Sequence, residues 1–95
     1  MKQAQPATLM CSYNRINGTY ASQNHWLLTD VLRGDWGFEG YVMSDWGAVA
    51  DPVAAVAAGL DLEMPSSGER GPKAIVQAVQ AGTLDETVLD KAVSR

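Results

Sequence analysis

The stretch GYVMSDWGA, Gly40 to Ala48, decides the fold class of this chain. The apolar run from Tyr41 to Met43 is typical of a strand covered on both faces of a parallel sheet. Asp45 comes soon after this run, where a carboxylate costs free energy unless it has a partner or a task. Its position alone leaves four roles open, which are nucleophile, general base, metal ligand and helix cap.

Two other stretches of the sequence also predict strands. ATLMCSYN, from Ala7 to Asn14, predicts a buried strand, and the Asn17-Gly18 pair after it predicts a turn in the following loop. LDLEM, from Leu60 to Met64, alternates apolar and acidic residues and predicts a third, short strand that ends at Pro65.

Helices are predicted between and after these strands. The Asp51-Pro52 pair is typical of an N-cap followed by proline in the first turn, and Gly59 and Gly34 are expected to end helices. The predicted helices run from Ser22 or Asn24 to Gly34, from Pro52 to Gly59, from Pro72 to Ala81, and onward from the capping-box pattern TLDE of Thr83 to Glu86. Their apolar stripes lie at Leu27, Leu28, Val31 and Leu32, at Ile75, Val76 and Val79, and at Val88, Leu89, Ala92 and Val93.

The alternation of strands and helices predicts an α/β fold built from parallel βα units. A complete eight-stranded barrel of such units needs about 250 residues, so we expect this chain to form one part of a larger domain. In parallel sheets, functional groups gather where the strands end at their carboxyl edge. Tyr13, Asp45 and Glu63 all follow predicted strands in this way.

Composition excludes some classes of partner. With a net charge of -4 and only 7 Lys and Arg residues, the chain has no basic patch for nucleic acid or an anionic membrane surface. Its single cysteine, Cys11, can form neither an internal disulfide nor a cysteine metal site. The chain shows no targeting or membrane-spanning segment, which leaves both a cytoplasmic and a secreted location open.

Three motifs in order, MCSYNRINGTYAS, LLTDVLRGDWGFEGYVMSDWGA and AGLDLEMP, resemble the catalytic barrel of glycoside hydrolase family 3, the family of many β-glucosidases. The resemblance implies a partial (β/α)8 TIM-type barrel, roughly its last three βα units. Residues 1–95 would then be the C-terminal segment of the family's N-terminal catalytic barrel domain. The activity implied is retaining hydrolysis of a β-glucoside or another small β-glycoside, with no cofactor and no metal.

The resemblance also assigns site residues. It makes Asp45 the catalytic nucleophile and places Met10, Tyr13 and Trp46 around the sugar, with Tyr13 donating a hydrogen bond to the Asp45 carboxylate. The acid/base glutamate would come from an α/β domain that follows the barrel, and other sugar contacts from earlier barrel strands. We therefore expect the chain to need the rest of the barrel and that domain, and to be inactive alone.

Less specific interpretations of the same residues remain open. Asp45 would otherwise cap the turn before Pro52, Met10 would be a core residue, and Trp46 would pack at a domain boundary. His25 is expected at the surface or at a helix start, Trp26 is assigned to helix packing, and Trp36 is assigned to the loop before the second strand. For the whole chain, the alternatives are a carbohydrate-binding fragment without catalytic activity and a structural half-barrel whose open sheet edges associate with a partner.

Overall fold

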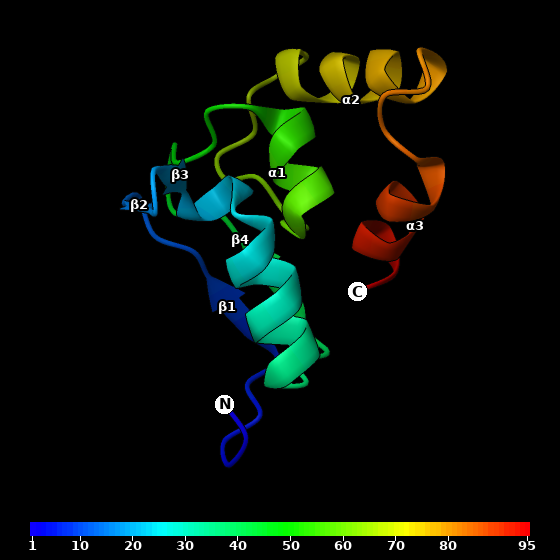
Figure 1. Ribbon diagram of the computed structural model, residues 1–95. Helices are drawn as coiled ribbons and strands as arrows, with labels where there is room; N and C mark the ends of the chain where they lie inside the picture. Colours follow the sequence, from blue (N-terminus) through cyan, green and yellow to red (C-terminus); the bar gives the residue numbers. More distant parts are fainter.

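The computed structural model describes residues 1–95 as short strands packed against a series of helices (Figure 1). Helices η2 (Trp26–Asp35) and α1 (Pro52–Ala58) lie next to the strands, and α2 (Arg70–Gln80) and α3 (Glu86–Ser94) contact α1. None of the helices is both long and apolar enough to cross a membrane. The remaining elements are β1 (Thr8–Met10), β2 (Arg15–Ile16), β3 (Thr19–Tyr20), η1 (Ala21–Gln23) and β4 (Tyr41–Met43).

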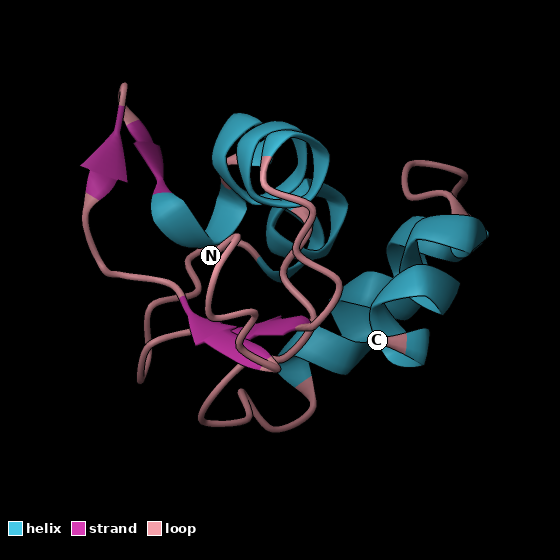
Figure 2. Cartoon of the chain, turned by 90° about the horizontal axis from the view of Figure 1, so that it is seen from below, coloured by secondary structure: helices cyan, strands magenta, loops and turns pink.

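The central feature is a parallel pairing between β1 and β4, which lie side by side in Figure 2. Leu9 is in register with Val42, and Met43 forms a further parallel bridge with Leu62 on its other side. The α/β prediction with parallel strands is therefore confirmed. Gly40 lies so close to β1 that an added Cβ would sit 2.0 Å from the carbonyl oxygen of Ala7.

The predicted third strand is wrong in extent, because it is reduced to that single bridge at Leu62. Side chains take the hydrogen bonds on both sides of the bridge. The Val42 N–H donates to the Asp61 carboxylate at 2.8 Å, and the Met64 N–H donates to the Ser44 hydroxyl at 2.8 Å. Since these backbone groups bond to side chains, the regular ladder does not extend further.

The Asn17-Gly18 turn is confirmed, but it closes a small hairpin that the sequence analysis did not predict. Asn17 has φ 52° and Gly18 has φ 84°, the left-handed pair that a tight two-residue hairpin turn requires. It joins β2 to β3 in antiparallel register.

Helix η2 begins as predicted and ends later. The Asn24 side chain accepts a hydrogen bond from the Leu27 N–H at 3.0 Å, which satisfies a free amide in the first turn. The helix is wound as a π-helix and passes through Gly34, so the predicted stop there is wrong. The chain leaves the helix at Gly37, where φ is 68°.

Helix α1 follows its sequence pattern closely. Asp51 accepts hydrogen bonds from the N–H groups of Val53 and Ala54, and Pro52 occupies the first turn. Gly59 ends the helix with φ 118°, in the left-handed conformation that favours glycine. An added Cβ at Gly59 would lie 2.9 Å from the Thr29 hydroxyl, so the glycine also permits close packing of α1 on η2.

The start of α3 differs from the capping-box prediction. Asp85 is the N-cap and accepts from the Thr87 N–H, whereas the Thr83 hydroxyl donates to the carbonyl of Ala78 in the preceding helix. The predicted buried stripe of α3 is partly wrong, since Val93 is 80% exposed, and Val76 on the apolar face of α2 is 52% exposed.

The hydrophobic core lies between the strands and helices η2 and α1. Its members are Cys11, Leu28, Leu32, Phe38, Val42, Val49, Ala55, Ala58 and Leu60. Burial alternates along β4, with Val42 and Ser44 buried and Met43 and Asp45 only half-buried. One face of the strand therefore packs on the helices, and Asp45 belongs to the other face.

Candidate active site

Asp45 lies directly beyond the carboxyl end of β4, the middle one of three parallel segments. Its N–H donates to the Cys11 carbonyl at 3.1 Å, which continues the pairing between β1 and β4 by one more bond. The Asp45 carbonyl accepts from the Ala48 N–H at 3.0 Å and closes a turn. The backbone of Asp45 is thus fixed by a strand on one side and by its own turn on the other.

The Asp45 carboxylate is half-buried and is oriented by a local bond. Its Oδ1 accepts a hydrogen bond from the Trp46 N–H at 2.6 Å. The turn before Pro52 also bonds to Asp45, as the less specific interpretation expected, whereas the N-cap of α1 is Asp51, which bonds to two amides of that helix.

Tyr13 follows β1 and reaches the same edge of the sheet. Its hydroxyl donates to the carbonyl oxygen of Trp46 at 2.5 Å. A hydroxyl has one proton, and the Trp46 carbonyl and the expected acceptor, the Asp45 carboxylate, compete for it. Partial loss of hydration, followed by this hydrogen-bonding and charge effect of Asp45, raises the pKa of the Tyr13 hydroxyl.

Three large side chains are exposed at this edge. Trp46 is 64%, Met10 is 62% and Tyr13 is 53% exposed. Met10 is paired in register with Met43, and its exposure shows that it is not a core residue in this chain. Exposed apolar and aromatic side chains beside a carboxylate can provide contact surface for a ligand with both polar and apolar faces.

Two residues close to Asp45 were not predicted as site residues by the sequence analysis. Ser44 is 1% exposed and its hydroxyl bonds to both the N–H and the carbonyl of Met64. Cys11 is buried beside the Asp45 backbone, and burial raises the pKa of its thiol. A serine inside an apolar strand, next to an acid, is the feature of the sequence that could have indicated Ser44.

The other residues considered above have no contact with the Asp45 carboxylate among the hydrogen bonds and ion pairs of the structure. His25 is exposed at the start of η2, as predicted, with its Nδ1 3.5 Å from Asp30 Oδ1. Trp26 is 54% exposed, so it is not a core packing residue, and Trp36 lies between η2 and β4, in the loop before the second strand as predicted. Glu63 bonds to the Ser67 hydroxyl at 3.0 Å. No three His, Cys, Asp or Glu side chains lie together as a metal ion would need.

Parallel strands with helical cover, and a carboxylate at their carboxyl edge, define the general site layout of an α/β enzyme. The family comparison makes this class specific. The chain belongs to glycoside hydrolase family 3, since the family model described as "Glycosyl hydrolase family 3 N terminal domain" matches residues 2–95.

Individual relatives agree with the family. The chain is 52% identical over 95 residues to "Thermostable beta-glucosidase B" of Acetivibrio thermocellus, covering 100% of this chain and 13% of that protein. It is 58% identical over 91 residues to an "Exo-alpha-(1->6)-L-arabinopyranosidase" of Bifidobacterium longum, covering 96% of this chain and 12% of that protein. The chain therefore spans about an eighth of the length of these relatives.

Solved structures give the same result. A family 3 β-glucosidase of Bifidobacterium adolescentis matches with a TM-score of 0.90 and 57% identity, over 96% of this chain and 13% of that one. β-Glucosidase 3B of Thermotoga neapolitana in complex with glucose matches with a TM-score of 0.91 and 45% identity, over 97% of this chain and 14% of that one. The family predicted from the three sequence motifs is confirmed.

Proposed function

We propose that the protein hydrolyses terminal β-glucosidic bonds by a retaining double displacement in which Asp45 is the nucleophile. The observation that carries the proposal is the position of the Asp45 carboxylate, half-buried at the carboxyl end of the central strand and oriented by the Trp46 N–H. A nucleophile has to be accessible to the sugar and yet fixed in direction, and this arrangement meets both needs.

In the proposed reaction, Asp45 attacks the anomeric carbon and the bond to the leaving oxygen breaks as a covalent glycosyl-enzyme forms. A second carboxyl group, about 5 Å from the nucleophile, protonates the leaving oxygen and then activates the water that releases the sugar. We assign that acid/base role to a residue outside these 95 positions, in a following α/β domain. Met10, Tyr13 and Trp46 are proposed to form the wall of the sugar site.

We further propose that residues 1–95 are the C-terminal segment of the family's N-terminal catalytic barrel domain, roughly its last three βα units. The parallel order of β1, β4 and the Leu62 segment, with helices between them in the chain, supports this. The rest of the barrel would supply further contacts to the sugar hydroxyls. The alternatives, a carbohydrate-binding fragment without catalysis or a structural half-barrel, give no reason for a half-buried carboxylate that the Trp46 N–H orients at this edge.

The nucleophile is tested in the longest native chain that contains these residues. We expect Asp45→Asn to remove nearly all turnover of an aryl β-glucoside while leaving the fold intact, because the amide cannot attack the anomeric carbon. A fluorinated glucoside that traps the covalent intermediate should label Asp45, located by peptide mass spectrometry. Label on another carboxylate would refute the assignment.

The matched control is the same substitution at the neighbouring helix cap, Asp51→Asn. Asp51 is exposed and bonds only to amides of α1, and asparagine also caps helices. Turnover of the aryl β-glucoside should therefore stay unchanged in this variant. An equal loss of turnover in both variants would mean that the effect is not specific to Asp45.

The substrate class and the missing acid are tested together. The panel contains an aryl β-glucoside, an aryl α-L-arabinopyranoside and a β-linked glucose disaccharide, because named relatives include both kinds of glycosidase. Residues 1–95 alone are expected to leave the disaccharide intact, since its leaving oxygen needs an acid that this chain does not supply. Turnover of the disaccharide by residues 1–95 would place the acid/base within this chain and contradict the proposal.

A further inference from the structure

The buried Ser44 hydroxyl makes two hydrogen bonds to one peptide segment, although the proposed reaction assigns it no role. It accepts from the Met64 N–H at 2.8 Å and donates to the Met64 carbonyl at 3.1 Å. Ser44 directly precedes Asp45 and is 1% exposed. A buried polar group with both its donor and acceptor functions satisfied is costly to replace.

The hydroxyl takes the place of the next bond in the parallel ladder. The Leu62 N–H donates to the Val42 carbonyl at 3.1 Å, and the Ser44 N–H donates to the Leu62 carbonyl at 2.9 Å. In a regular ladder the Met64 N–H would then donate to the Ser44 carbonyl. Here it donates to the Ser44 side chain instead. The strand pairing therefore ends at Ser44, and the main chain turns at Asp45.

The same Met64 peptide also holds the far side of the turn. Its carbonyl accepts from the Gly47 N–H at 2.9 Å as well as from the Ser44 hydroxyl. Gly47 has φ 78°, so the chain here adopts a conformation that favours glycine. Ser44 and Gly47 flank Asp45 and Trp46, so both ends of this dipeptide are attached to Met64.

We propose that Ser44 is a positioning residue that sets the direction of the Asp45 carboxylate by fixing its backbone to Met64. This inference rests on the proposed function, in which Asp45 is the nucleophile. Only a hydroxyl among side chains of this size both accepts well from an amide and donates well to a carbonyl. Without the Ser44 hydroxyl, the backbone of Asp45 would be held only by its bond to the Cys11 carbonyl and by its own turn. The Gly47 N–H would then make the one remaining bond from this segment to Met64.

The test compares Ser44→Ala with Ser44→Thr in the longest native chain that contains these residues. A displacement of about 1 Å at a reacting group can lower the rate by about a hundredfold. We therefore expect Ser44→Ala to lower kcat and the rate of labelling by a fluorinated glucoside by about tenfold to a hundredfold, with little change in KM. Ser44→Thr keeps the hydroxyl and is expected to retain most of kcat. An unchanged kcat in Ser44→Ala would overturn the proposal.

A second measurement does not depend on activity. Hydrogen exchange at the Met64 amide should accelerate in Ser44→Ala, because its acceptor is gone, and exchange as slow as in the native protein would overturn the proposal. Should Ser44→Ala not fold, Ser44→Cys replaces it, since a thiol fills similar space but is a weak donor and acceptor. The same loss of kcat is expected there, and an unchanged kcat overturns the proposal.

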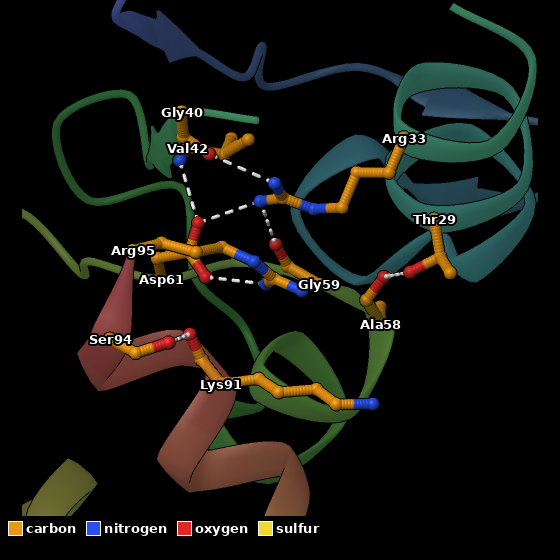
Figure 3. A network of polar contacts seen from close by, with 10 residues as sticks. All are labelled: Thr29, Arg33, Gly40, Val42, Ala58, Gly59, Asp61, Lys91, Ser94 and Arg95. Carbon is orange, nitrogen blue, oxygen red and sulfur yellow. Dashed lines mark hydrogen bonds and ion pairs between the residues drawn. The ribbon is translucent and has the colours of Figure 1, made fainter. Parts of the chain in front are cut away.

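Thr29→Val is the matched control. The Thr29 hydroxyl donates to the Ala58 carbonyl at 2.7 Å, between η2 and α1 (Figure 3), and makes no hydrogen bond to Asp45. Loss of the bond to Ala58 should lower the free energy of unfolding without changing kcat. An equal loss of kcat in Thr29→Val and Ser44→Ala would show a general effect and overturn the proposal.

Asp45→Asn is assayed in parallel. If it retained turnover, the proposed function would fail, while exchange at Met64 would still decide whether Ser44 holds that peptide.

Discussion

At the scale of single residues, Tyr13 is the side chain that joins the two strand ends of the site. Its hydroxyl donates to the Trp46 carbonyl, and partial loss of hydration, followed by the effect of the nearby Asp45 carboxylate, raises the pKa of this hydroxyl. The hydroxyl therefore keeps its proton to a higher pH than an ordinary tyrosine does. This matters for the proposed reaction, since a phenolate beside Asp45 would add a second negative charge there.

The first residue-scale prediction is that Tyr13→Phe slows the chemical step more than it weakens substrate binding. The variant removes the bond to Trp46 and leaves that carbonyl free to move relative to Asp45. We expect kcat to fall and KM to change little, measured by steady-state kinetics on an aryl β-glucoside. A change confined to KM would show that Tyr13 only contacts the sugar.

The raised pKa of Tyr13 has its own pH dependence. A group with a raised folded-state pKa holds its proton more tightly when folded, so its contribution to stability is complete below the unfolded pKa and is lost as the pH rises through the folded pKa. An ultraviolet titration of the native chain should show a tyrosine that ionises above pH 10 and that disappears in Tyr13→Phe. Tyr20→Phe, which removes an exposed partner of Arg15, is the control titration.

At the scale of elements, the features that the sequence predicted are those whose causes are local. The Asp51 cap, the Gly59 stop and the Asn17-Gly18 turn each depend on residues within a few positions, and all three are confirmed. The third strand depends on Ser44 and Met64, which are 20 positions apart in the chain. Such a bond has no local pattern, so the shortening of that strand could not be predicted.

The candidate site also combines features with local causes, which the sequence predicts, and features that depend on tertiary structure. Asp45 was singled out because an acid after an apolar run is visible in the sequence, and its place at the strand end follows from local structure. The bond from Tyr13 to Trp46 spans 33 positions and depends on how β1 pairs with β4. Which of two neighbouring acceptors takes the Tyr13 proton is decided by this tertiary arrangement.

The element-scale prediction concerns the start of α3. Asp85 accepts from both the N–H and the hydroxyl of Thr87, and these bonds lower the pKa of its carboxyl group. A lowered folded-state pKa contributes stability that is complete above the unfolded pKa and is lost as the pH falls through the folded pKa. We expect Asp85→Ala to lower the melting temperature at pH 7 and to lose less stability than the native chain on acidification.

Asp85→Asn is the matched variant, because asparagine also caps helices but does not titrate. It should keep most of the stability at pH 7. If Thr83→Ala lowered the melting temperature and Asp85→Ala did not, the helix would start at the capping box that the sequence analysis predicted.

At the scale of the whole molecule, one ion-pair network connects elements that are distant in the sequence (Figure 3). The Asp61 carboxylate is 2% exposed and accepts from Arg33 at 2.7 Å and from Arg95, which follows α3, at 2.9 Å. It also accepts from the Val42 N–H in β4 at 2.8 Å. Arg33, on η2, donates in addition to the carbonyls of Gly40 and Gly59. The network therefore joins η2, β4, the end of α1 and α3.

We expect this network to contribute more to the free energy of unfolding than a surface ion pair does, because the Arg33 and Asp61 side chains are largely buried. Burial lowers the pKa of the Arg33 guanidinium, and the Asp61 carboxylate opposes that shift. An arginine remains protonated in proteins, so Arg33 cannot escape the cost of burial by losing its proton. Removing Asp61 would leave that charge unpaired and would also leave the Val42 N–H without its acceptor.

We therefore predict that Asp61→Ala lowers the free energy of unfolding by about 3 to 5 kcal/mol, the range for breaking one partner of a buried pair. The control is Lys73→Ala, which breaks the exposed pair with Glu69 and should cost less than about 1 kcal/mol. Both are measured by urea unfolding followed through tryptophan fluorescence, in the longest native chain that contains these residues. Because Asp61 also anchors the start of β4, its loss should loosen the strand that carries Asp45, and hydrogen exchange at Val42 should accelerate. Equal effects of the two variants would mean that the buried network contributes no more than a surface ion pair.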